Sequence, residues 1–152
     1  MILFWCVSFL VVLWLLIVIL NAFSRPPENL GVTNDSLSPC PDSPNCVCSQ
    51  DPSESHQIAP FPFTDSAKHA RERLLTILRQ SPGCTVMQAD ENYVRAEFRT
   101  RWLRFVDDVE FLIDARQNAI QVRSASRIGY SDLGANRQRV EALRRQFEQS
   151  SP

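Results

Sequence analysis

The sequence predicts an α+β fold: an N-terminal transmembrane helix, followed by an antiparallel sheet of about four strands packed against two helices. Three observations predict it. A long apolar run occupies the N-terminus, apolar residues recur at helical spacing at 67–78 and 133–147, and apolar and charged residues alternate between those two stretches. A spacing of three to four residues is typical of an amphipathic helix, and strict alternation is typical of a half-buried strand. The expected order after the apolar run is therefore α-β-β-β-β-α.

The N-terminal run extends from Ile2 to Leu20 and contains one polar residue, Ser8. As a helix it would be roughly 28 Å long, close to the hydrocarbon thickness of a bilayer. A cleaved signal peptide and a buried core helix are the alternatives. However, no Lys or Arg precedes the run, and Leu20 is too large for the −3 position of a cleavage site after Ala22. We therefore expect residues 1–23 to be an uncleaved single-pass anchor, with the lipid bilayer as its partner through residues 2–23.

Residues 24–63 are rich in Pro, Asn, Asp and Ser and poor in periodic apolar residues, which predicts an extended Pro-rich linker. Within this linker, positions 40–48 read C-P-D-S-P-N-C-V-C. The prolines and turn-forming residues between Cys40 and Cys46 make a small disulfide loop plausible. A disulfide would require an oxidising compartment and would favour a domain on the periplasmic or other non-cytoplasmic side. Arg25, close to the apolar run, weakly favours the cytoplasmic side instead.

The cysteines leave two other interpretations open, namely free thiols and a metal site. Cys48 could pair with Cys84 or stay free, while Cys6 lies in the apolar run. The C-x5-C-x-C spacing departs from that of zinc sites, and nothing in the sequence places His56 or His69 near the cysteines. We therefore expect no metal ion and no cofactor.

The folded α+β domain is expected over residues 64–152. Helical spacing begins after Thr64 and Asp65 and stops at Ser81-Pro82-Gly83. Strands are expected at about 84–87, 94–102, 109–113 and 120–122, and a final helix at about 132–149. The short connections make neighbouring strands antiparallel, with both helices on one face of the sheet. The other face carries alternating Arg, Asp and Glu side chains, which we expect to be solvated.

A polar cluster is expected where the sheet meets the final helix. Two of the four glycines lie in the segment 123–137, and Asn136 falls on the apolar stripe of the helix, where a polar side chain needs hydrogen-bond partners. Arg127 and Arg137 could reach the aspartate pair at 107–108. The cluster is either a filled polar network or a small pocket at the helix N-terminus that holds an anion. Its expected members are Asp107, Asp108, Arg123, Ser126, Arg127, Ser131, Asp132, Asn136 and Arg137.

Composition and motifs narrow the function classes. Sixteen basic residues against seventeen acidic ones argue against a nucleic-acid partner. The sequence has no Gly-rich phosphate loop, zinc-protease pattern or nucleophile elbow. We therefore expect a non-catalytic binding or accessory module with a small anionic ligand.

Two alternatives from other classes remain. One is a hydrolase-like enzyme that uses Asp108 or a loop serine, although a serine nucleophile needs an adjacent base. As consecutive strand residues, Asp107 and Asp108 should also point to opposite faces of the sheet. The other alternative is a thiol redox or metal role for Cys40, Cys46 and Cys48.

Four stretches of the sequence resemble the family called domain of unknown function 1499: C-P-D-S-P-N-C-V at 40–47, A-E-F-R at 96–99, F-V-D-D-V-E-F at 105–111 and R-S-A-S-R-I-G-Y-S-D-L-G-A-N-R at 123–137. The similarity covers about residues 40–147. It implies a bacterial or chloroplast-type protein with export or membrane signals, which favours the non-cytoplasmic side. It also implies that a disulfide joins Cys40 to Cys46, whereas the family often has Ser at the position of Cys48. The resemblance implies no catalytic residue.

Overall fold

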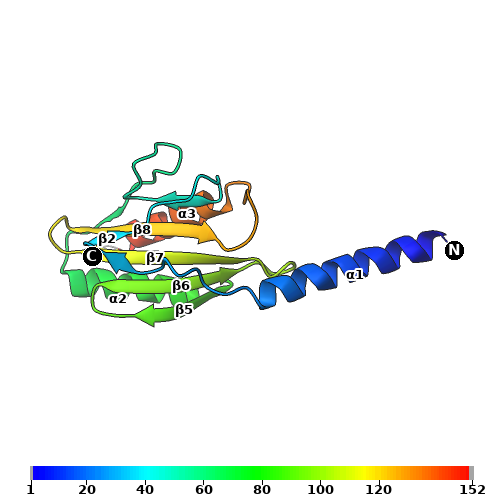
Figure 1. Ribbon diagram of the computed structural model, residues 1–152. Coiled ribbons are helices and arrows are strands. Elements are labelled where there is room, and N and C mark those ends of the chain that lie inside the picture. Colours follow the sequence, from blue (N-terminus) through cyan, green and yellow to red (C-terminus); the bar gives the residue numbers. More distant parts are fainter. Residues whose placement is uncertain (1, 151–152) are drawn as a thin grey trace.

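The computed structural model describes residues 2–150 and places α1 at one end of a layered domain (Figure 1). In chain order the elements are α1 (Ile2–Ala22), β1 (Val32–Thr33), β2 (Ser36–Leu37), β3 (Cys46–Cys48), β4 (Phe61–Pro62), α2 (Ala67–Gln80), β5 (Cys84–Ala89), β6 (Tyr93–Arg99), β7 (Val106–Asp114), β8 (Ala119–Ser126) and α3 (Ala135–Gln149). The helices and antiparallel strands confirm the α+β class, with an apolar helix at the N-terminus.

The sheet is larger than the sequence predicts. The main sheet has six strands in the order β3-β8-β7-β6-β5, with β4 also paired to β8, and β1 and β2 form a separate two-stranded ribbon. All of these pairs are antiparallel. The prediction of about four strands is wrong because residues 32–62 supply β1–β4. Residues 24–63 therefore pack on the domain instead of forming an extended linker.

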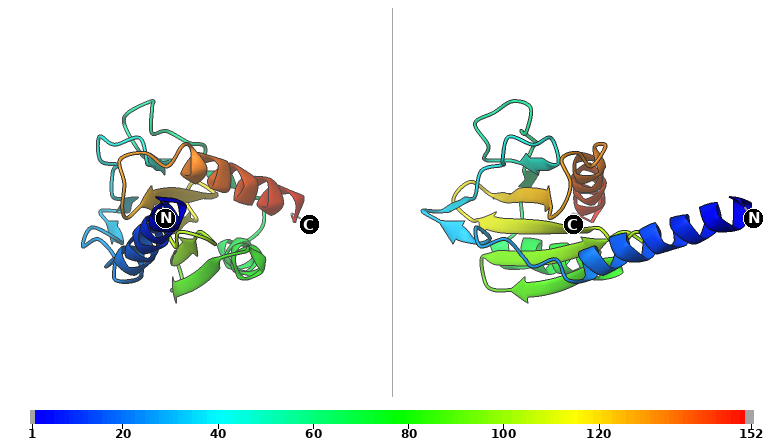
Figure 2. Two further views of the ribbon diagram at one scale, coloured as in Figure 1. Left: turned by 90° about the vertical axis from the view of Figure 1, so that its right-hand side faces the viewer. Right: turned by 45° about the vertical axis from the view of Figure 1, so that its right-hand side comes forward.

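Helices α2 and α3 cover one face of the main sheet (Figure 2). The apolar core lies between these two layers. Phe61 is fully buried there, with ring centroids 5.9 Å from Phe111 of β7 and 5.8 Å from Phe147 of α3. Ser66 caps α2 by accepting a hydrogen bond from the His69 backbone N–H at 3.2 Å, so the helix begins slightly later than Thr64 and Asp65 predict.

The turn after α2 requires its glycine. Gly83 has a φ of +73°, a region that L side chains rarely adopt. A Cβ atom there would also lie 2.6 Å from the backbone oxygen of Arg99. The Arg99 N–H in turn donates to the Gly83 C=O at 2.9 Å, so this close approach fixes the end of β6.

The opposite face of the sheet is covered by protein and not by solvent. The chain between α1 and β3 crosses it, and Leu37 of β2 packs there with Tyr93, Leu112 and Cys48 in a second, smaller apolar cluster. Every residue of β7 is buried as a result. The expectation of a solvated charged face is wrong because the chain before β3 folds back over the sheet.

Helix α1 has the length and composition of a membrane span. Its segment Phe4–Ala22 has a mean hydropathy of 2.6, and 6% of that segment is buried inside the protein. These properties fit a single-pass span or a signal sequence, and neither fixes the side of the membrane. The last turn of α1 contacts the domain, since Asn21 is 2% exposed.

Candidate functional site

The candidate site residues of the sequence separate onto the two faces of the sheet. Asp107 contacts Arg139 of α3 on the helix side, while Asp108 contacts Arg95 and Arg127 on the other side. Alternation along β7 predicts this divergence of Asp107 and Asp108. The structure therefore contains two polar networks in place of the one expected cluster.

Asn136 is the centre of the network on the helix side. It is 1% exposed. Its amide oxygen accepts hydrogen bonds from Ser124 Oγ at 2.5 Å and from Arg139 Nη1 at 2.8 Å. Its amide nitrogen donates to the Asn45 C=O at 2.9 Å and to Ser126 Oγ at 3.0 Å. The polar residue on the buried stripe of α3 is thus fully hydrogen-bonded, as a buried polar group requires.

Asp107 completes this network. It accepts hydrogen bonds from Ser126 Oγ at 2.5 Å and from Arg139 Nη2 at 2.6 Å. The expectation that Arg137 reaches the aspartate pair is wrong. Arg137 instead donates to the backbone carbonyls of Gln57 at 2.7 Å and Ser55 at 2.9 Å, so it fixes the loop after β3.

The N-terminus of α3 is occupied by a carboxylate of the protein itself. Asp132 accepts hydrogen bonds from the backbone N–H groups of Gly134 at 3.0 Å and Asn136 at 2.7 Å. Ser131 Oγ accepts from the Leu133 N–H at 3.3 Å. Since the Asp132 carboxylate takes the place of an external anion, the helix N-terminus does not form the pocket that the sequence suggests.

The opposite face of the sheet carries a layer of buried charges, called the charged layer below. It consists of four arginines and three carboxylates: Arg95, Arg99, Arg123, Arg127, Glu97, Asp108 and Glu110. The side chain of Arg127 is 4% exposed and those of its partners Asp108 and Glu97 are 1% and 5% exposed. Buried ions of this kind need partners, because their hydration is lost.

Arg127 holds the charged layer together near α1. Its Nε and Nη2 donate to the two oxygens of Asp108 at 2.6 and 2.7 Å, and Nη2 also contacts Glu97. Its Nη1 donates to the Ser24 C=O at 3.1 Å. The Asp108 hydrogen bonds raise the pKa of Arg127. Burial tends to raise the pKa of Glu97, but hydrogen bonds from Arg127 and Arg99 outweigh it and lower that pKa below its ordinary value of 4.5.

Glu110 binds the other end of the charged layer. It is completely buried, and its Oε2 accepts a hydrogen bond from Arg123 Nη1 at 3.1 Å. Its Oε1 accepts from the Tyr93 hydroxyl and from the Gly31 N–H, both at 2.7 Å. Burial, followed by this contact with Glu110, raises the pKa of Tyr93. Among the described residues, Arg123 Nε is buried without a hydrogen-bond partner.

A cavity of about 320 Å³ adjoins the charged layer, between β7, β8 and the segment 25–41. Its charged lining residues are Arg25, Asp108, Arg123 and Arg127. Three of these four are predicted site residues, and three of the four are cationic. The arrangement can present guanidinium donors to a small anion.

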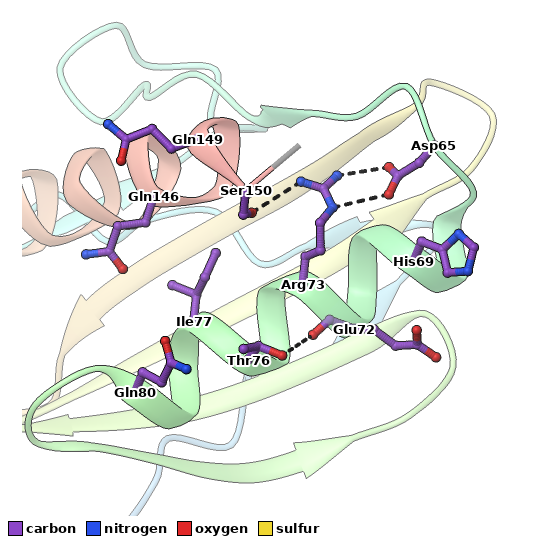
Figure 3. A pocket seen from close by; sticks show the side chains of 10 residues that line it. All are labelled: Asp65, His69, Glu72, Arg73, Thr76, Ile77, Gln80, Gln146, Gln149 and Ser150. Carbon is purple, nitrogen blue, oxygen red and sulfur yellow. Dashed lines mark hydrogen bonds and ion pairs between the residues drawn. The ribbon is translucent and has the colours of Figure 1, made fainter. Parts of the chain in front are cut away.

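A second cavity, of about 710 Å³, is an open groove between α2 and α3 (Figure 3). None of the predicted site residues lines it. Arg73 projects into it and forms an ion pair with Asp65 at 2.9 Å, which lowers the pKa of that carboxyl group. Arg73 Nη1 also donates to the Phe147 C=O at 3.0 Å. Since the Arg73 guanidinium already binds Asp65 and the Phe147 C=O, this groove is a weaker candidate site for an anion.

The structure joins Cys40 to Cys46 by a disulfide, as the family resemblance implies. Cys48 is a free, buried thiol whose pKa is raised by burial. Cys84 is also free, and burial raises its pKa to about 11. Across residues 2–150, no three His, Cys, Asp or Glu side chains are grouped so as to hold a metal ion. His56 Nδ1 instead lies 3.1 Å from the Cys46 backbone oxygen.

Alkylation should distinguish these cysteines. In the denatured, unreduced protein we expect iodoacetamide to modify Cys6, Cys48 and Cys84 but neither Cys40 nor Cys46. In the native protein Cys48 should react slowly because it is buried and its pKa is raised. Peptide mass spectrometry with and without prior reduction measures both. Labelling of Cys40 without a reductant would contradict the assignment.

Sequence reasoning missed several members of the two networks. Strand alternation predicts Glu97 and Glu110 on the same face as Asp108, but because that face is expected to be solvated they are not among the predicted site residues. Arg139 lies three residues after Asn136, on the same side of α3. Asn45 gave no signal, because its part of the chain has no apolar periodicity to predict packing.

The fold and site define a class of protein: a small α+β domain whose N-terminal segment covers a layer of buried charges, preceded by an apolar helix. The family model described as "Protein of unknown function (DUF1499)" matches residues 36–147. The chain belongs to this family. Searches of curated proteins and of solved structures found no match.

Proposed function

We propose that the protein is a membrane-anchored, non-catalytic binding module that holds a small anionic group in the cavity beside its charged layer. The observation that carries the proposal is Arg123. Arg123 is 3% exposed and lines the cavity, and its Nε has no hydrogen-bond partner among the described residues. A buried donor without an acceptor costs free energy, and an anion in the cavity would recover that cost if the Arg123 guanidinium turned Nε toward it.

The charge balance supports an anion as the ligand. The charged layer contains one more arginine than carboxylates, and Arg25 adds a further cation at the cavity. Guanidinium groups bind carboxylate and phosphate oxygens through paired, charge-assisted hydrogen bonds. A singly or doubly charged oxyanion would balance this excess.

The contacts of the reactive groups favour binding over catalysis. Asp108 is held by Arg127 and Arg95, so it is poorly placed to act as a base. Ser126 donates to Asp107, and that carboxylate is also paired with Arg139 at 2.6 Å, so it is not a free base for the serine. A serine nucleophile needs a free base next to it.

Helix α1 supports attachment to a membrane, and the disulfide supports a location of the domain on the non-cytoplasmic side. Helix α1 has the length and hydropathy to cross a bilayer. The Cys40–Cys46 disulfide is typical of an oxidising compartment. In this arrangement α1 holds the cavity close to the lipid surface, because Arg25 follows shortly after Ala22.

Charge reversal at the cavity tests the proposal. Arg25 is exposed, so Arg25→Glu should leave the melting temperature of the full-length protein in zwitterionic nanodiscs unchanged. We expect phosphate to bind the wild type and to bind this variant roughly ten- to a hundredfold more weakly, since a charge-assisted hydrogen bond is lost. Isothermal titration calorimetry with inorganic phosphate measures the change.

Arg145→Glu is the matched control for this experiment. Arg145 is an exposed arginine of α3 that does not line the cavity, so its reversal changes the net charge equally. Phosphate should bind this variant as it binds the wild type. Absence of saturable phosphate binding to the wild type, or equal binding by the Arg25→Glu variant, would refute the proposed site.

A further inference from the structure

Two loops leave the sheet at the end from which α1 projects (Figure 1). One joins β6 to β7 through residues 100–105, and the other joins β8 to α3 through residues 127–134. The two loops begin side by side, because Arg99 pairs with Val106 and the Arg127 N–H donates to the Val106 C=O at 3.0 Å. These two segments are called the anchor-side loops below.

The anchor-side loops expose large apolar side chains. Trp102 is 71% exposed, Tyr130 75% and Leu133 91%. Leu133 also has a φ of 55°, a conformation that costs free energy for a residue with a Cβ atom. Three large apolar side chains exposed on two neighbouring loops favour a binding surface at this end of the sheet.

Helix α1 contacts the β6–β7 loop. The indole Nε1 of Trp14 donates a hydrogen bond to the Trp102 backbone oxygen at 3.0 Å. Trp14 lies about eight residues before the end of α1 at Ala22, which corresponds to about 12 Å along a helix. The helix needs nearly its whole length to cross the hydrocarbon region of a bilayer. A loop that contacts α1 at Trp14 is therefore held at the depth of the adjoining lipid leaflet.

The chemistry of the β6–β7 loop suits that environment. The Thr100 N–H donates to the Phe105 C=O at 3.0 Å and the Phe105 N–H donates to Thr100 Oγ1 at 2.9 Å, so part of its backbone is hydrogen-bonded internally. Internal backbone hydrogen bonds are what a lipid-facing segment needs. Arg101 and Arg104 flank Trp102, and the Arg101 guanidinium lies 5.4 Å from the Trp102 ring centre. Arginines at this level can extend to anionic headgroups while the indole remains among the acyl chains.

We propose that the anchor-side loops insert into the lipid leaflet on the domain side of the membrane, where the C-terminal end of α1 emerges. In a bilayer containing anionic lipids, Trp102 then contacts the acyl chains of that leaflet. The inference rests on the proposed membrane anchoring by α1. It adds a second attachment to the membrane, which fixes the orientation of the domain on the lipid surface.

Tryptophan quenching by lipids with brominated acyl chains tests the insertion. The full-length Trp5→Phe protein retains Trp14 and Trp102, and the Trp5→Phe/Trp102→Phe protein retains only Trp14. The difference between their emission spectra isolates Trp102 with the Trp14 contact intact. In vesicles of phosphatidylcholine and phosphatidylglycerol, brominated chains should reduce the Trp102 emission at least twofold.

The matched control carries its reporter at the opposite end of the sheet. The Trp5→Phe/Trp102→Phe/Val32→Trp protein places an indole on β1, close to the β7–β8 turn, where Asp35 pairs with Arg116. This reporter should show no quenching by brominated chains. Quenching of Trp14 without quenching of Trp102 would overturn the insertion and leave the anchor intact. Absence of Trp14 quenching would overturn the anchor and the inference together.

Discussion

Arg127→Met is expected to lower the unfolding free energy of the domain more than Asn136→Leu or the charge reversal Arg25→Glu. The variant leaves the carboxylates of Asp108 and Glu97 buried without their main partner. Breaking a buried ion pair on one side typically costs about 3–5 kcal/mol of unfolding free energy. Chemical denaturation of the full-length protein in detergent micelles at pH 7 measures the loss. Arg99→Met is the control, because Arg99 binds Glu97 from a position where its side chain is 30% exposed.

The deficit of the Arg127→Met variant should depend on pH. In the wild type the pKa of Glu97 lies below its ordinary value, so its contribution to stability is present above that value and is lost as the pH falls through the folded-state pKa. Without Arg127, fewer hydrogen bonds oppose the effect of burial, so the pKa of Glu97 rises. Protonation of Glu97 then removes its unpaired buried charge and restores part of the variant's stability. The difference in unfolding free energy between the two proteins should therefore narrow from pH 7 to about pH 4. A difference that stays constant over this interval would contradict the assigned partners.

Asn136→Leu should have the second largest effect. The substitution leaves the Ser124 hydroxyl, in a fully buried residue, without its acceptor, and removes the donor to the Asn45 C=O. Each buried group left unpaired costs about 1–3 kcal/mol, so we expect a loss of about 2–4 kcal/mol. Gln138→Leu, on an exposed position of α3, should be nearly neutral in the same denaturation experiment. Equal stabilities of the two variants would show that the Asn136 network does not stabilise the domain.

The strands that the sequence predicts correctly are those whose signal is local. Strands β6, β7 and β8 alternate apolar and polar residues over much of their length, and the turn between β7 and β8 contains Asn118 at a φ of 51°. Strands β3 and β4 have two or three residues each and exist because they pair with β8, far along the chain. Periodicity cannot reveal strands of this length.

In the candidate site, too, the features with a local sequence signal are predicted and those that depend on distant parts of the chain are not. Strand alternation placed Asp107 and Asp108 on opposite faces, and the buried stripe of α3 placed Asn136 in the interior. The choice between Arg137 and Arg139 depends on helix phase, since only Arg139 lies one turn from Asn136 on the Asp107 side. The burial of the charged layer depends on the chain before β3 folding over the sheet, which local pattern does not encode.

The hydrogen bond from Arg127 to the Ser24 C=O restricts how far the domain can move from its anchor. Helix α1 ends at Ala22, so a single residue separates the helix from the first backbone group that the charged layer holds. With α1 in a bilayer, there is no stalk to let the domain swing outward or rotate freely. A soluble anion bound at the proposed cavity would therefore have to reach the lipid surface to meet Arg25, whereas an anionic headgroup would already lie close to it.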